Sequence, residues 1–430
     1  MNILTQFKDK EINVDISFPF LNVLSQQDYF EKNVNILICI STYNEEKIIK
    51  KIEELNKANI KYPFLKLFLG EYENLEKLPI NYNQVKKLDI MENFYNSNFD
   101  YDNIIYKKLF CNFNKENLIY LIIGGIDEKR RTEILINYIN EFKSLEYLKL
   151  INFEFLKENV LQLCKMKTLI IEKCKNIAFE ENSLTSLINL SLDNCKINNP
   201  YKKLYKLPNL EKCSLKWSRN CRSREGDIYY TEKGDEDMNH LEYFNSIIDF
   251  NSIKNLIEFE GDYKQFMLLK NCNLKLNKIK LISQLSHDPV KLFYYMYGVM
   301  GSRNIKDFKK SLNEEKCEEK DFILYFENEK NAIEKICNST ELKEVEFEIM
   351  SIEEEELLKF NINNVVQKLT IIYNHIENIF KNIIEKFPNA SELFMTIGLC
   401  GGGDTPKFII EENANCKINK INIIIPESAF

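Results

Sequence analysis

Apolar residues return in the same frame four times between residues 145 and 217. The four segments read LEYLKLINF, MKTLIIEKCKNI, LINLSLDNCKI and LPNLEKCSLKW. The central apolar residues of successive segments are 21, 21 and 23 residues apart. In each, apolar residues two positions apart share one face of a short strand, while the residue between them faces the other way. Leu148 and Leu150 are therefore expected to point inward and Lys149 outward. A strand this short buries too little surface to fold alone, so the pattern predicts strands stacked on their neighbours.

The same frame can be followed through most of the chain. Most steps between successive strand centres are 21 to 28 residues long, and two are close to 44. The segments between the strands have the spacing of short helices or turns. The predicted strand centres are Leu37, Leu65, Leu88, Leu121, Leu148, Leu169, Leu190, Cys213, Leu256, Ile279, Leu324, Val345, Leu369, Leu393 and Ile421.

The frame LxxLxLxx(N/C)x(I/L) resembles that of leucine-rich-repeat proteins, most closely at Leu187, Leu190, Leu192, Cys195 and Ile197. Cys174 and Cys195 occupy the turn position, where a side chain can bond to buried backbone. The resemblance implies an α/β fold, a curved horseshoe solenoid with a concave parallel sheet and short helices or turns on the convex side. About 15 repeats would span residues 34–430, after an N-terminal cap at residues 1–33.

Two stretches interrupt the rhythm. Residues 217–243 are polar and glycine-rich and predict an insertion loop, and residues 285–320 predict an irregular stretch. The first holds the only tryptophan, Trp217, with Arg219, Arg222 and Arg224. Trp and Arg often anchor protein interfaces, so this loop is either a recognition loop or a tolerated insertion.

Leucine-rich-repeat proteins generally present the concave sheet to another protein, so the resemblance implies a non-catalytic interaction scaffold. The outward positions of the strands mix charged and apolar side chains, which suits a protein partner. The partner-binding candidates are Lys149, Ile170, Ser191 and Ser214, together with the four loop residues above. The full outward column is Lys66, Asp89, Ile122, Lys149, Ile170, Ser191, Ser214, Lys280, Tyr325, Glu346, Thr370 and Phe394.

Composition narrows the class of partner. The formal net charge is -7 and acidic and basic residues are interspersed, which argues against a nucleic-acid ligand. No apolar run approaches the roughly 18 residues of a membrane span, and no secretory signal is visible at the start. The 12 cysteines show no disulfide or zinc spacing. We therefore expect a cytoplasmic protein with reduced thiols.

The sequence offers no catalytic constellation. His240, His287 and His375 have no partner at ligand or triad spacing, and Cys317 lies among carboxylates that oppose thiolate formation. The glycine-rich stretch at residues 398–407 lacks the GKS or GKT ending of a phosphate loop. We expect no enzyme activity, no cofactor and no metal.

Two other functions stay open. The protein could be the substrate-recognition subunit of a ubiquitin ligase, with residues 1–33 recruiting the catalytic subunits. It could also be a secreted or surface recognition protein, in which case the glycosylation acceptor patterns at Asn338 and Asn389 would matter. The oligomeric state cannot be derived from the sequence.

Overall fold

The computed structural model divides the chain into two units, Met1–Tyr205 and Lys206–Phe430, called unit 1 and unit 2 below. The structure describes residues 45–57, 62–69, 78–92, 106–125, 130–132, 134–155, 160–162, 165–216, 244, 246–269, 276–282, 320–349, 352, 354–373, 379–397 and 420–424.

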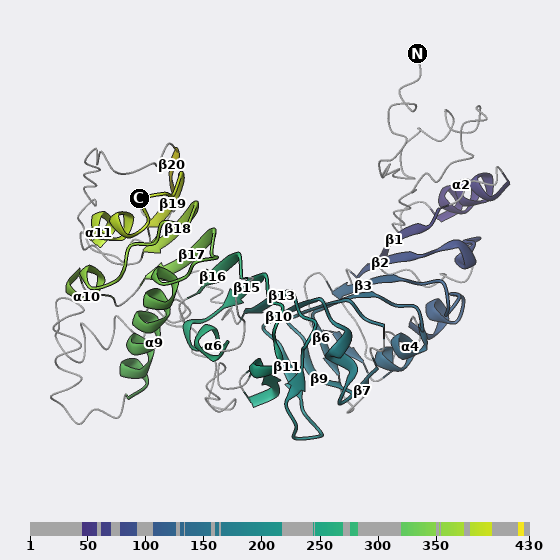
Figure 1. The fold of residues 1–430 in the computed structure, drawn as a ribbon. Helices are drawn as coiled ribbons and strands as arrows, with labels where there is room; N and C mark the ends of the chain where they lie inside the picture. The colour runs from purple at the N-terminus through teal and green to yellow at the C-terminus, as the bar shows by residue number, and fades with distance from the viewer. Residues whose placement is uncertain are drawn as a thin grey trace, which may run out of the picture. The chain divides into compact units, whose positions relative to one another are not determined.

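Unit 1 contains a parallel sheet whose strands follow one another in the order of the sequence (Figure 1). The alternation of buried and half-exposed residues in β5, β8 and β10 confirms that one side of each strand faces the core. The predicted centres are in register across the sheet, from Leu65 through Leu88, Leu121, Leu148 and Leu169 to Leu190. The strands are β1 (Phe64–Leu69), β2 (Lys87–Glu92), β3 (Tyr120–Gly125), β5 (Tyr147–Ile151), β8 (Thr168–Glu172) and β10 (Asn189–Asp193).

A second parallel sheet in unit 1 forms where the sequence predicted only turns or short helices. Its path runs through β11 (Lys196–Asn198), β9 (Lys175–Phe179), β6 (Phe153–Phe155) and β4 (Arg130–Thr132), and β7 (Val160–Leu161) pairs with β9. The chain enters this sheet through corners at Asn152, Lys173 and Asn194, whose φ angles are 63°, 55° and 51°. The backbone N–H groups of Asn152 and Lys173 donate to the carbonyls that end the next main strand.

Short helices complete the described part of unit 1. Most of them contribute apolar side chains to the core, including Ile52, Leu135, Ile136 and Leu184. These elements are α2 (Glu45–Lys57), α4 (Leu135–Glu141) and the 3-10 helices η4 (Tyr82–Gln84) and η5 (Ser183–Ser186).

Unit 2 repeats the principle with a sheet that is also parallel and sequential. Its strand centres are in register from Cys213 through Phe259, Ile279, Val345 and Leu369 to Leu393 and Ile421, and the first five of these residues are buried. The strands are β13 (Lys212–Lys216), β15 (Glu258–Gly261), β16 (Lys278–Leu281), β17 (Glu344–Ile349), β18 (Lys368–Tyr373), β19 (Glu392–Ile397) and β20 (Lys420–Ile424).

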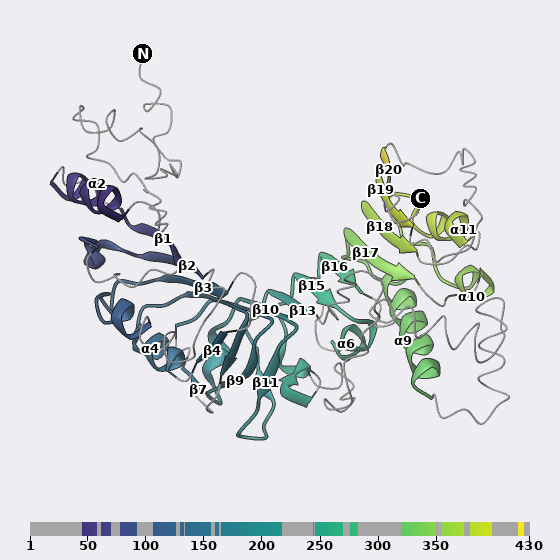
Figure 2. The same ribbon diagram turned by 180° about the vertical axis from the view of Figure 1, so that it is seen from behind.

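The helices of unit 2 connect these strands. In both views α9, α10 and α11 lie beside β17 to β20 on the same side of the sheet (Figures 1 and 2). Side-chain hydrogen bonds connect neighbouring repeats. Asn363, which precedes β18, donates to the Ile336 and Ser339 carbonyls at the end of α9. The elements are β12 (Tyr205–Lys206), β14 (Ile248–Asp249), η6 (Phe250–Ser252), α6 (Tyr263–Leu268), α9 (Lys320–Cys337), α10 (Glu354–Leu358) and α11 (Ile379–Lys386).

Two predicted strand positions are wrong. Leu324 lies within the helix α9, so Tyr325 does not belong to the outward column. The strand predicted at Leu256 is β15, which starts at Glu258, and its inward centre is Phe259. The strand predicted at Leu37, the cap at residues 1–33, the loop at residues 217–243 and residues 285–319 of the irregular stretch lie outside the described residues; Lys320 begins α9.

The described residues thus form an α/β structure with long parallel sheets, few helices and no closed barrel, compatible with a repeat-type fold. Its core is mostly aliphatic, with fully buried aromatic side chains such as Tyr106, Phe153 and Phe259. None of the helices in the described part combines the length and hydrophobicity that a bilayer crossing requires.

Candidate protein-binding face

The outward residues of β3, β5, β8 and β10 form a continuous surface in unit 1, which we call the unit 1 face. Register pairing places Ile122, Lys149, Ile170 and Ser191 in one row across these strands. All four are partly exposed, whereas the residues on either side of each along the strand are buried. The face consists of Tyr120, Ile122, Tyr147, Lys149, Ile151, Thr168, Ile170, Glu172, Asn189, Ser191 and Asp193.

One half of the unit 1 face is apolar and aromatic. The Tyr120 and Tyr147 rings stack with centroids 4.0 Å apart and planes inclined by 14°. Ile151 occupies the space above Gly124, because a Cβ at Gly124 would lie 3.0 Å from the Ile151 Cβ. Ile122 lies on β3 with Tyr120, and Ile170 lies on β8, on the other side of Lys149. An approaching protein could cover these apolar groups together.

The polar groups of the face are partly satisfied within it. Lys149 Nζ lies 2.8 Å from Glu172 Oε1, with 24% and 31% of the two side chains exposed. The Asn189 amide donates to Thr168 Oγ1 at 3.0 Å. Since Lys149 and Glu172 neutralise each other in the middle of the face, it has no concentrated charge that would select a polyanion.

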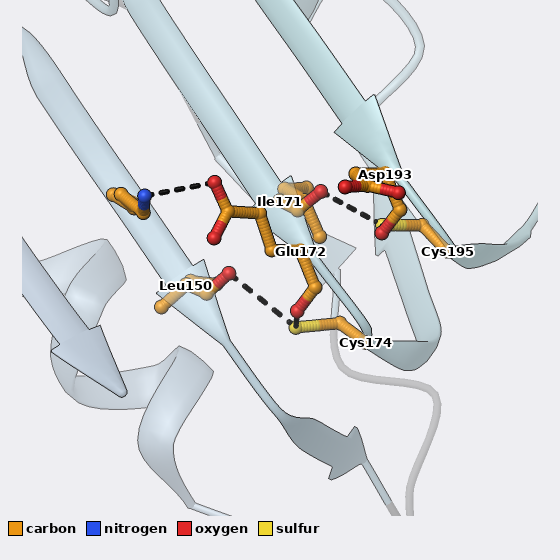
Figure 3. A network of polar contacts seen from close by, with 7 residues as sticks. Leu150, Ile171, Glu172, Cys174, Asp193 and Cys195 are labelled. Atoms are coloured by element: carbon orange, nitrogen blue, oxygen red, sulfur yellow. Dashed lines mark hydrogen bonds and ion pairs between the residues drawn. The ribbon is translucent and has the colours of Figure 1, made fainter. Parts of the chain in front are cut away.

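Two buried thiols lie just beyond the ends of β8 and β10 (Figure 3). The Cys174 Sγ donates to the Leu150 and Glu172 carbonyls at 3.6 and 3.3 Å, and the Cys195 Sγ to the Ile171 and Asp193 carbonyls at 2.9 and 3.0 Å. Burial, with the neighbouring Cys174 thiol, raises the pKa of Cys195 well above its usual range, so the donor form persists. The predicted bonding of these two cysteines to buried backbone is therefore confirmed.

The outward side of the unit 2 sheet has a different character. There Ser214 donates to Glu260 Oε2 at 2.8 Å, and Lys280 Nζ lies 2.7 Å from Glu346 Oε1 and 3.7 Å from Glu260 Oε1. Burial alone would lower the pKa of Lys280, but the hydrogen bonds and charges of Glu346 and Glu260 outweigh it and raise that pKa. From β13 to β17 this surface is a network of charged and polar side chains.

A depression of about 600 Å³ lies beside α6 and α9 in unit 2 and includes Phe266, Leu269, Leu276 and Lys335 in its lining. Lys335 Nζ donates to the Phe266 and Leu269 carbonyls, both at 3.2 Å, and lies 4.2 Å from the centroid of the Phe266 ring. The charge of Lys335 therefore caps the end of α6, which is a structural role.

The structure brings together three of the predicted partner-binding residues. Lys149, Ile170 and Ser191 are neighbours in register on β5, β8 and β10, while Ser214 lies on β13 in unit 2. Trp217, Arg219, Arg222 and Arg224 lie outside the described residues.

Sequence reasoning missed Tyr120, Tyr147, Ile151, Thr168, Glu172, Asn189 and Asp193. Each lies two positions from a residue of the predicted column, on the same side of its strand, so extending that alternation by one step would have found them.

Comparison of the chain with models of known protein families finds no match, and a search of curated proteins finds no similar sequence. Within the described residues, no group of three or more His, Cys, Asp or Glu side chains is arranged to hold a metal ion.

Proposed function

We propose that the protein is a non-catalytic interaction scaffold that binds another protein through the unit 1 face. In this proposal the repeats form a leucine-rich-repeat solenoid, and the sheet face is its concave, partner-binding side. The 21-residue register from Leu148 through Leu169 to Leu190 and the Cys174 and Cys195 turn positions support this assignment.

The observation that carries the proposal is the patch around the stacked Tyr120 and Tyr147 rings. These rings, with Ile122, Ile151 and Ile170, remain partly exposed on strands whose other side is fully buried. Tyrosine supplies a large contact area at low entropic cost, and aromatic groups are enriched where proteins bind one another. A partner segment with aromatic or branched aliphatic side chains would cover the patch, while Thr168, Asn189 and Ser191 offer hydrogen bonds at its edge.

The test replaces the middle of the face with carboxylates. The triple variant Lys149→Glu, Ile170→Glu and Ser191→Glu should lose at least about tenfold in partner affinity, because it breaks the Lys149–Glu172 pair and places charge in the apolar contact. Proteins captured from a lysate by the wild type are identified by mass spectrometry. The affinity of the purified partner is then measured for each variant.

A matched control changes the charge equally at another surface of unit 1. Lys196→Glu, Tyr201→Glu and Leu204→Glu also replace one lysine and two uncharged residues, at exposed positions that are not on the main sheet. Both variants should keep the wild-type circular dichroism spectrum. Partner capture that survives the face substitutions, or is lost equally in the control, would refute the assignment.

A further inference from the structure

The strands β13 to β17 of unit 2 carry outward charges whose sign is uniform within a strand and alternates between strands. Register pairing aligns Lys212 with Glu258, Glu258 with Lys278 and Lys278 with Glu344. The residues are Lys212 and Lys216 on β13, Glu258 and Glu260 on β15, Lys278 and Lys280 on β16, and Glu344 and Glu346 on β17.

We call the boundary between two neighbouring strands a junction. The close ion pairs among these residues occur at two junctions. Between β13 and β15, Lys212 Nζ lies 2.6 Å from Glu258 Oε1, and Lys216 Nζ lies 2.9 Å from Glu260 Oε2.

Between β16 and β17, Lys278 Nζ lies 3.3 Å from Glu344 Oε2, and Lys280 Nζ lies 2.7 Å from Glu346 Oε1. The junction of β15 with β16 has the longer contact of 3.7 Å between Lys280 and Glu260.

These two junctions are also those that the chain reaches by long connections. It leaves β13 at Lys216 and enters β15 at Glu258, and it leaves β16 at Leu281 and passes through α9 before entering β17 at Glu344. A short return segment can deliver a strand only to the neighbouring edge. A long connection costs little more to close in another arrangement, so it does not specify which edge the returning strand joins.

Burial of apolar side chains does not by itself specify which neighbour a strand joins. Each strand contributes a buried apolar residue at the same register position, as Cys213, Phe259, Ile279 and Val345 do. The outward charges distinguish the strands, because β16 paired with β13 would bring Lys278 opposite Lys212. Likewise, β17 paired with β15 would bring Glu344 and Glu346 opposite Glu258 and Glu260. Like charges opposite each other on neighbouring strands are destabilising.

We propose that the alternating signs on β13, β15, β16 and β17 specify strand order in unit 2, so that each strand returning from a long connection joins the correct neighbour. The device is independent of partner binding by unit 1. A single exposed ion pair contributes little to stability. Order is decided by the difference in free energy between opposite and like charges, summed over the two junctions.

The decisive variant exchanges the outward charges of β15 and β16 and leaves the amino-acid composition and net charge unchanged. Both long-connection junctions then join like charges, while the short junction between β15 and β16 keeps opposite ones. This exchange variant carries Glu258→Lys, Glu260→Lys, Lys278→Glu and Lys280→Glu.

A second variant restores alternation in the opposite sense. It adds Lys212→Glu, Lys216→Glu, Glu344→Lys and Glu346→Lys to the exchange variant, with Lys368→Gln to avoid a like pair between β17 and β18. A control places like charges at an equally exposed pair between repeats that are joined by a short step. Lys167→Glu does so opposite Glu146, because Lys167 Nζ lies 2.8 Å from Glu146 Oε2 in the wild type.

Each protein is unfolded in urea and diluted, and the fraction that regains the native circular dichroism spectrum and elution volume is measured at low and high salt. At low salt we expect the exchange variant to recover at least about threefold less native protein, and about 1 M NaCl to remove most of the defect by screening. The restored variant and Lys167→Glu should refold like the wild type.

Three outcomes in the exchange and restored variants would overturn the proposal, and a fourth would come from the control. The first three are full recovery of the exchange variant, an equal defect in the restored variant, and a defect that salt does not reduce. An equal loss of native protein in Lys167→Glu would show that the defect does not depend on long connections, and it would overturn the proposal as well.

Discussion

Asn363 offers the sharpest test of how neighbouring repeats stabilise each other in unit 2. Its side chain is 2% exposed, and its amide donates to the Ile336 carbonyl at 2.9 Å and the Ser339 carbonyl at 2.8 Å. Its Oδ1 accepts from the Val365 and Val366 N–H groups at 2.8 and 3.1 Å. One side chain thus caps the end of α9 and orders the segment that leads into β18.

The cost of removing this side chain follows from the four bonds. The bonds to Ile336 and Val366 are buried, and a buried partner left unsatisfied costs about 1–3 kcal/mol. The other two bonds are partly buried, so water can replace them in part. Asn363→Ala should therefore lower the free energy of unfolding by about 3–6 kcal/mol. For a slope near 3 kcal/mol/M, the urea midpoint falls by about 1–2 M.

The assay is urea unfolding followed by circular dichroism. Asn361→Ala is the matched control, because Asn361 is exposed and its amide donates to Asn338 Oδ1 at the surface. Asn363→Asp keeps an acceptor for Val365 and Val366 but turns an oxygen toward the two carbonyls, so it should also destabilise. If Asn363→Ala shifted the midpoint no further than Asn361→Ala, the inter-repeat cap would not be a main source of stability.

Two further predictions concern the core. Leu190→Asp buries a charge at a position that is 2% exposed and should lower the free energy of unfolding by several kcal/mol. Ser191→Asp, at the next residue on the outward side of β10, should change the melting temperature little. Equal effects of the two substitutions would contradict the orientation of β10. Burial raises the pKa of Cys337 to about 12, although Lys386 opposes the shift, while Cys111 is exposed. Iodoacetamide at about pH 8 should therefore alkylate Cys111 and spare Cys337 until the protein unfolds, as peptide mass spectrometry would show. The Cys337 thiol keeps its proton to a higher pH in the folded protein than in the unfolded chain. Its contribution to the free energy of unfolding is therefore complete below pH 9 and is lost as the pH rises toward 12. The urea midpoint should fall less over this pH range in Cys337→Ala than in the wild type.

Much of the sheet could be predicted because its inward residues carry a strong periodic signal. The Leu169 and Leu190 strands lie where the frame places them, and their register is the one that the spacing requires. The strand predicted at Leu324 was wrong because the apolar run around this residue is too short to distinguish a strand from a helix. The helix shows in the buried face formed by Phe326, Ala332, Ile333 and Ile336 further along.

The shift of β15 has a different cause. Its inward residues are Phe259 and Gly261, and a glycine adds nothing to an apolar pattern, so the nearby Leu256 carried the stronger signal. This error hid Glu258 and Glu260, and with them the alternation of charge in unit 2. The second sheet of unit 1 was missed because most of its strands, such as β6 and β11, are no longer than three residues and leave too few positions for a period to appear.

The left-handed corners at Asn152, Lys173 and Asn194 bear on how such a chain can change length over evolutionary time. They recur at the interval that separates β5, β8 and β10, each with the same backbone conformation and each followed by a buried residue. A duplication or deletion spanning one full interval would join like to like, leaving every corner and the layer behind it intact. A gain or loss of any other length would put a corner residue within a strand, so the genetic step that this region tolerates is the whole repeat.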